Sequence, residues 1–171
     1  GLVAGSVSLL GGEPGVGKST LLLQAAGRLA ADGRSVLMVS AEESAQQVAM
    51  RAERLGVGGE GISLVTDDDV DRLLATALAD PPDLIVIDSI QTVGVAELPG
   101  GPGSVSQVRE SAARLIRFAK EHGVATVLVG HVTKDGGIAG PKLLEHMVDV
   151  VLYLEGDPDR GLRALRCLKN R

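Results

Sequence analysis

The sequence predicts an α/β domain with a mostly parallel central sheet, flanked by helices and ending in a C-terminal antiparallel hairpin. Short apolar runs alternate with amphipathic segments of helical spacing, as in parallel sheets whose strands are joined by crossover helices. The only aromatic residues, Phe118 and Tyr153, leave Leu, Val, Ile and Ala to build the core, which is usual for a sheet buried on both faces. Turn residues at 157–161, between the last two apolar runs, indicate the hairpin.

The individual elements follow from local patterns. Apolar runs predict strands over 7–10, 35–40, 62–65, 84–88, 126–130, 148–155 and 162–168. Helical spacing predicts helices over 18–31, 46–55 and 104–122, and a short helix near 142–146. A further helix is expected between a cap at Thr66 or Asp67 and the stop at Pro81-Pro82. The Gly/Pro-rich stretch 94–104 has little reason to be ordered by itself.

Length and composition limit the class of protein. The 171 residues suit one domain with a sizeable core, and the net charge of −5 argues weakly against nucleic-acid binding. No apolar run approaches the roughly 20 residues that span a bilayer, no signal peptide is expected, and the lone Cys167 excludes a disulfide framework and is expected to be buried. We therefore expect a cytoplasmic protein. Because the chain opens with Gly1 rather than Met, we interpret residues 1–171 as a domain excised from a longer protein.

A phosphate-binding loop follows the first predicted strand. The motif G-x-x-x-x-G-K-[ST] lies between an apolar strand and a helix, the context in which backbone N–H groups and the helix N-terminus surround phosphates. The nucleotide-binding candidates are Gly12, Glu13, Pro14, Gly15, Val16, Gly17, Lys18, Ser19 and Thr20. Lys18 can bridge the β- and γ-phosphates of ATP, and the Ser19 hydroxyl can ligate Mg²⁺.

Three carboxylates are candidates for the rest of an ATPase site. Asp88 ends the most convincing buried strand and can hold Mg²⁺ through water. Ser89 follows it, where many P-loop ATPases have the glutamate that activates water, so the base must come from elsewhere. Glu42 and Glu43 follow the strand 35–40, where a carboxylate would face the γ-phosphate. Glu42 is the better candidate because it comes first, and Glu43 can assist it.

Other nucleotide enzymes fit the residues less well. Guanine recognition usually requires [NT]-K-x-D, and Gly136 stands where that pattern needs Asp. No Arg-rich lid for a small-molecule acceptor is evident, which disfavours a small-molecule kinase without excluding it.

Several stretches together resemble one family. The P-loop, Ser-Ala-Glu-Glu after the next strand and Leu-Ile-Val-Ile-Asp-Ser look like the RecA/DnaB class of ATPases. Residues 130–136, 139–142, 144–149, 153–157 and the final Lys-Asn-Arg at 169–171 narrow this class. Over nearly the whole chain, the sequence resembles the ATPase domain of the bacterial RadA (Sms) family of recombination and repair proteins.

The resemblance implies a RecA-like fold, ATP and Mg²⁺ as cofactors, and a hexameric ring that hydrolyses ATP between neighbouring subunits. It also implies branch migration of recombination intermediates on single-stranded DNA, with a recombinase as a further partner and no membrane. Family members carry an N-terminal four-cysteine zinc module and a C-terminal Lon-protease-like domain, for which residues 1–171 have no room.

The resemblance also assigns roles to residues beyond the P-loop. Lys169 and Arg171 would act in trans on the neighbour's γ-phosphate, and His131 would sense the γ-phosphate. Lys134 and Lys142 flank the second Gly-rich loop and are candidates for DNA contact. A nucleotide-dependent assembly switch of the KaiC type shares the P-loop and the paired glutamates, and it stays open as the alternative to a DNA motor.

Overall fold

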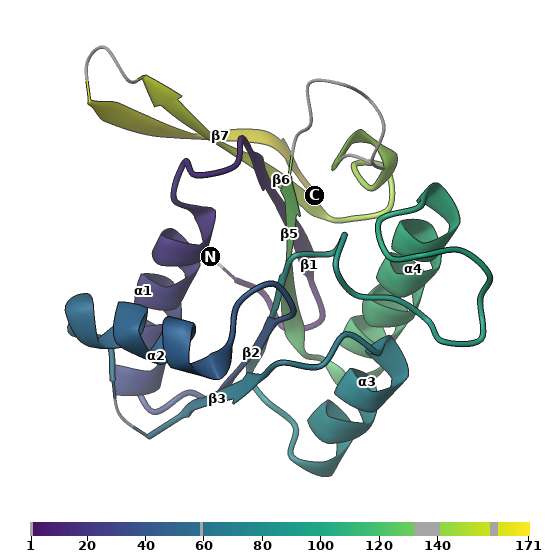
Figure 1. The fold of residues 1–171 in the computed structure, drawn as a ribbon, viewed down its shortest axis with the longest axis horizontal. Helices are drawn as coiled ribbons and strands as arrows, with labels where there is room; N and C mark the ends of the chain where they lie inside the picture. The colour runs from purple at the N-terminus through teal and green to yellow at the C-terminus, as the bar shows by residue number, and fades with distance from the viewer. Residues whose placement is uncertain (1, 59, 132–140, 158–160) are drawn as a thin grey trace.

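A seven-stranded sheet forms the centre of the molecule (Figure 1). The structure, a computed structural model, describes residues 2–58, 60–131, 141–157 and 161–171. The strands are β1 Val7–Gly12, β2 Val36–Ser40, β3 Ile62–Val65, β4 Leu84–Asp88, β5 Ala125–His131, β6 Val150–Asp157 and β7 Leu162–Asn170. Their order is β3-β2-β4-β5-β1-β6-β7, with every neighbouring pair parallel except β6 and β7. The predicted mostly parallel sheet with an antiparallel C-terminal hairpin is confirmed.

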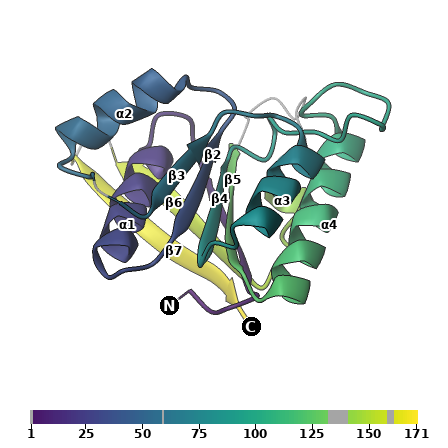
Figure 2. The same cartoon turned by 90° about the horizontal axis from the view of Figure 1, so that it is seen from below.

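The helices cover both faces of this sheet. They are α1 Lys18–Ala31, α2 Ala45–Arg54, α3 Val70–Ala79 and α4 Val105–His122. Figure 2 shows α1 and α2 on one face, and α3 and α4 on the other. The short helix expected near 142–146 is instead a single 3-10 turn, η1 Pro141–Leu143.

Two apolar clusters explain why the strands read as continuous apolar runs. One joins the sheet to α3 and α4 through side chains such as Leu73, Leu115 and Phe118. The other joins it to α1 through Leu22 and Leu23. Because both faces are covered, successive residues of β1 and β2 are buried whichever way they point.

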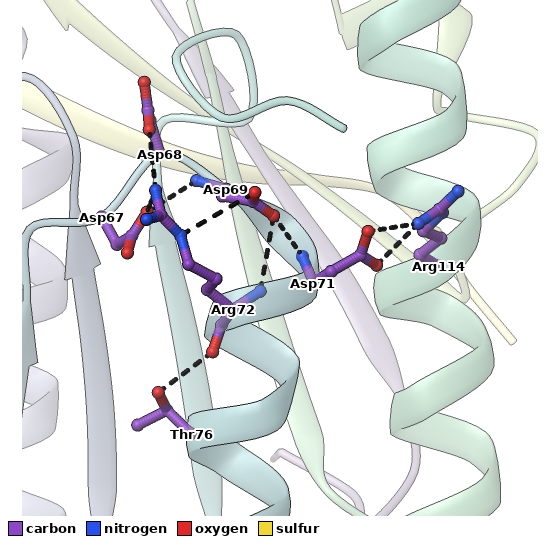
Figure 3. A network of polar contacts seen from close by, with 7 residues as sticks. All are labelled: Asp67, Asp68, Asp69, Asp71, Arg72, Thr76 and Arg114. Atoms are coloured by element: carbon purple, nitrogen blue, oxygen red, sulfur yellow. Dashed lines mark hydrogen bonds and ion pairs between the residues drawn. The ribbon is translucent and has the colours of Figure 1, made fainter. Parts of the chain in front are cut away.

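The start of α3 differs from the expected position (Figure 3). Neither Thr66 nor Asp67 caps the helix; the Asp69 carboxylate accepts hydrogen bonds from the backbone N–H groups of Asp71 and Arg72. A bridge between Asp69 and Gly94 fixes this position, since tertiary hydrogen bonds select one among several acidic caps. Figure 3 also shows Asp71 accepting from Arg114 of α4, at 2.6 Å, which joins the two helices.

Stretch 94–104 is held by one buried side chain. The Gln107 amide accepts a hydrogen bond from Val95 N at 2.8 Å and donates to the carbonyls of Val95, Leu98 and Gly100 at 3.1, 2.8 and 3.0 Å. An amide with two donors and an acceptor can satisfy several backbone groups at once. Gln107 of α4 thus adds to the backbone hydrogen bonds that Gly94 makes with Asp68 and Val70 at the start of this stretch.

Two further expectations concern Cys167 and membrane-spanning segments. Cys167 is exposed on β7, so the expectation that it is buried is wrong. Within the part of the chain that the structure describes, no helix has the length and apolar character that crossing a membrane requires.

Candidate active site

Parallel pairing brings the ends of four strands to one edge of the sheet. In the register, Gly12 of β1 is opposite His131 of β5, and Ser40 of β2 is opposite Asp88 of β4. Segments that follow carboxyl ends of parallel strands meet at such an edge, where ligands bind in open α/β sheets. The P-loop after β1 and Glu42 after β2 therefore reach the same region as Asp88 and His131.

The P-loop turns sharply between β1 and α1. Gly15 and Gly17 have φ of 78° and 108°, a region of backbone conformation that favours glycine. Gly17 is the N-cap of α1 and carries no side chain that could occupy the helix N-terminus. The first N–H groups of α1 are therefore free of a side-chain cap, as an anion-binding helix end requires. Glu13, Pro14 and Gly15 are exposed, and Val16, Ser19 and Thr20 are half-buried.

Lys18 lies buried beneath this loop. Its Nζ donates hydrogen bonds to the carbonyls of Gly12 and Glu13, both at 2.9 Å. Burial lowers the pKa of the ammonium below its usual value, while the carboxylates of Asp88 and Glu42 act in the opposite direction. The ammonium is thus placed in a desolvated position where a phosphate would be a favourable additional partner.

Asp88 and Ser19 are paired and fit a magnesium site. Burial raises the pKa of the Asp88 carboxyl above its usual value, although the hydrogen bond from Ser19 opposes the shift. No group of three or more His, Cys, Asp or Glu side chains that could hold a metal occurs in the described ranges. Magnesium in nucleotide sites needs only one or two protein oxygens together with phosphates and water. Asp88 and Ser19 supply that set.

Glu42 is directed toward the same site by Ser89 and His131. The buried Ser89 Oγ donates a hydrogen bond to Glu42 Oε1 at 2.8 Å. His131 Nε2 lies 3.3 Å from the same oxygen. The Glu42 side chain remains 45% exposed, so water can reach its carboxylate. The Asp88–Ser89 peptide bond, which joins the metal candidate to this hydrogen-bond donor, is cis.

The ring of His131 has unmet hydrogen-bonding capacity. Gln91 fixes its backbone by donating to the His131 carbonyl at 3.1 Å and accepting from its N–H at 3.3 Å. Both ring nitrogens are buried without a hydrogen-bond partner among the described residues, because the contact with Glu42 lacks hydrogen-bond geometry. A buried polar group of this kind favours an additional partner at the site, and a phosphate oxygen fits.

Glu43 points to a different partner. Its carboxylate forms an ion pair with Arg51 of α2. The two neighbouring glutamates, both candidates from the sequence, therefore have different partners: Glu42 contacts Ser89 and His131, and Glu43 contacts Arg51. Ser89, Gln91 and Arg51 were not identified as site residues from the sequence; for Ser89, its place directly after Asp88 is the signal that could have identified it.

Lys169 and Arg171 lie away from the P-loop of their own chain. In the sheet, Asn170 of β7 and Ser8 of β1 are both aligned with Val150 of β6. Ser8 precedes Gly12, where the P-loop begins, by four residues, and four residues of a strand span about 13 Å. Lys169 Nζ donates to the carbonyls of Glu145 and Val148, both at 2.7 Å, and the Arg171 N–H donates to Asp149 O at 3.1 Å.

The two DNA-contact candidates are placed differently. Lys142 is exposed on η1, after the segment that follows β5. Lys134 lies outside the described residues.

The chain is similar to one domain family and to a set of DNA repair proteins. A family model described as "AAA domain" matches residues 1–137. The "DNA repair protein RadA" of Pseudomonas aeruginosa is 54% identical over 171 residues, covering 100% of this chain and 38% of that protein. The proteins of the same name from Escherichia coli and Mycobacterium tuberculosis are 52% and 53% identical, again over 100% of this chain, and it covers 37% and 36% of their lengths. The chain thus spans less than two-fifths of these relatives, and the resemblance predicted from the motifs is confirmed.

Proposed function

Because the chain belongs to the AAA domain family and is similar along its whole length to DNA repair proteins named RadA, we propose that it is the ATP-hydrolysing motor of recombinational repair. In this proposal, ATP hydrolysis drives branch migration or strand remodelling on single-stranded DNA. The observation that carries the proposal is the convergence of Lys18, Asp88, Glu42 and His131 at the P-loop edge of the sheet.

The P-loop and Lys18 bind the phosphates. Backbone N–H groups at the start of α1 hold the phosphate chain, and the Lys18 ammonium turns from loop carbonyls to phosphate oxygens. The Ser19 hydroxyl and the Asp88 carboxylate would hold Mg²⁺, directly and through water. Bound Mg²⁺ supplies charge neutralisation for the β- and γ-phosphates.

Glu42 prepares the attacking water. Its carboxylate accepts a proton from water and orients the oxygen toward the γ-phosphate, while the Ser89 hydrogen bond fixes its direction. His131 donates from its otherwise unpartnered ring to a γ-phosphate oxygen and so distinguishes ATP from ADP. Glu43 remains with Arg51 and supports the start of α2.

The proposal includes a homo-oligomeric ring, which would be hexameric, as the resemblance to the RadA family implies. The distance between residues 169–171 and the P-loop of their own chain supports an action on another subunit's nucleotide. Lys169 would then leave the Glu145 and Val148 carbonyls, or hold them while Arg171 reaches the neighbour. Because each subunit would supply residues to its neighbour's nucleotide site, the rate of ATP hydrolysis would depend on assembly of the ring.

Single-stranded DNA is expected to raise the rate of ATP hydrolysis several-fold, because a motor couples turnover to its track. The test compares phosphate release with and without an oligonucleotide, at two salt concentrations, since phosphate contacts weaken as salt rises. Lys142→Ala should weaken the effect of DNA, whereas Lys120→Ala, at the C-terminal end of α4, serves as the matched control.

Equal rates with and without DNA, and no salt-dependent DNA binding, would contradict the motor. That outcome would favour a nucleotide-dependent assembly switch of the KaiC type. Transfer of the γ-phosphate to a metabolite rather than to water would instead indicate a small-molecule kinase.

A further inference from the structure

The hairpin of β6 and β7 lies against the P-loop of the same chain. A Cβ on Gly12 would lie 2.5 Å from the carbonyl oxygen of Leu154, and a Cβ on Gly156 would lie 3.3 Å from Val16. A side chain at Gly12 would collide with the backbone of β6, and one at Gly156 would be in tight contact with the Val16 side chain. The hairpin is therefore in direct contact with the phosphate-binding loop, although nothing in the motif itself involves it.

Arg163 of β7 extends this contact to the helix N-terminus. It is paired with Gly156 in the antiparallel register. Its guanidinium lies over Gly17, where a Cβ would be only 3.1 Å from Arg163 Nη1. The Arg163 guanidinium has no hydrogen-bond or ion-pair partner among the residues that the structure describes. An unpaired cation thus stands beside the end of α1 that attracts phosphate.

A cleft opens between the loop and the hairpin. Its volume is about 320 Å³, and its lining includes Pro14, Val16, Leu162 and Arg163. This volume is within the range of small-molecule sites, about 300–1,000 Å³. The lining combines apolar side chains with the Arg163 guanidinium and the carboxylates of Glu13 and Asp157. A guanidinium suits a phosphate, and carboxylates suit the hydroxyl and amino groups of a nucleoside, which donate hydrogen bonds.

The strand order indicates which end of the nucleotide reaches this cleft. Groups proposed to act on the γ-phosphate come from β4, β5 and the segment after β2, all on one side of β1. β6 and β7 lie on the other side. A nucleotide held at the loop after β1, with its γ-phosphate toward Asp88, must direct its nucleoside end toward the hairpin.

We propose that Arg163 holds the α-phosphate and sugar of a nucleotide bound at the P-loop of its own chain, with the hairpin cleft as the nucleoside subsite. This inference rests on the proposed ATPase function and adds a residue from outside the P-loop motif. A guanidinium is suited to the role, because its planar donors can bind phosphate oxygens in pairs and stack against a sugar or base.

The test measures binding of ADP and of pyrophosphate by calorimetry. Arg163→Ala is expected to weaken ADP binding about tenfold, the loss typical of one charge-assisted contact, and to change pyrophosphate binding less than twofold. Arg166→Ala is the matched control, since Arg166 is on the same strand but pairs with Glu155 at 3.0 Å. It should bind both ligands as the wild type does.

The outcomes separate this inference from the proposed function. If the wild type binds ADP and Arg163→Ala binds it equally well, the inference is wrong and the P-loop assignment stands. If Arg163→Ala lowers the affinities for ADP and pyrophosphate equally, Arg163 acts on the whole phosphate site, and its assignment to the α-phosphate and sugar is wrong. If the wild type binds neither ligand, the proposed ATPase function itself fails.

Discussion

Replacing Glu42 by Gln is expected to lower the rate of ATP hydrolysis by about 100- to 10,000-fold, the usual range for loss of a positioned general base. The amide keeps the size of the side chain but cannot accept the proton of the attacking water. ADP affinity should stay within about twofold, because the proposed role of Glu42 is to act on the attacking water and not on the groups that ADP retains. Phosphate release under saturating MgATP measures the rate, and calorimetry measures the affinity.

Glu43→Gln provides the matched control for this prediction. The adjacent carboxylate is in an ion pair with Arg51, whereas Glu42 receives the hydrogen bond of Ser89. Glu43→Gln should therefore retain turnover within a few-fold of the wild type. A Glu42→Gln variant that turns over at a near wild-type rate would remove Glu42 from the mechanism, and equal losses in both variants would contradict the distinction between them.

Replacing Lys18 by Met is expected to reduce ADP and pyrophosphate binding by about a hundredfold, the upper range for a contact to a charged group. Methionine preserves much of the buried stem but has no ammonium for the phosphates. Calorimetry with both ligands measures the loss, and thermal unfolding followed by circular dichroism verifies that the variant is folded.

Lys120→Met is the comparison for Lys18→Met, because its ammonium is more than half exposed and lies 3.9 Å from Asp149, away from the P-loop. It should bind both ligands normally. Retention of ADP binding within a few-fold by a folded Lys18→Met variant would contradict the phosphate role of the buried lysine.

The sequence predicts the sheet well because both of its faces are buried. The expected strands at 62–65 and 84–88 have the same bounds as β3 and β4, and the bounds of the other expected strands differ from those observed by at most two residues at each end. The start of α3 was misplaced because Thr66, Asp67 and Asp69 are all good caps, and the choice depends on contact with Gly94. Such tertiary selection leaves no local signal.

The candidate site is predictable where it follows from strand ends. Lys18, Asp88 and Glu42 follow or end parallel strands, and so their convergence can be inferred from the sequence. The link from Ser89 to Glu42 and the reach of Arg163 depend on side-chain direction and hairpin register. The order of stretch 94–104 depends likewise on Gln107, a residue of the following helix.

In the proposed assembly, each nucleotide is bound by one subunit and hydrolysed with residues of the next. The most direct test measures ATP hydrolysis per subunit across a range of protein concentrations, with single-stranded DNA present and with light scattering reporting the state of assembly. We expect the rate per subunit to rise as subunits assemble and then to reach a plateau. A rate per subunit that stays constant while light scattering reports the change from monomer to oligomer would contradict the shared site.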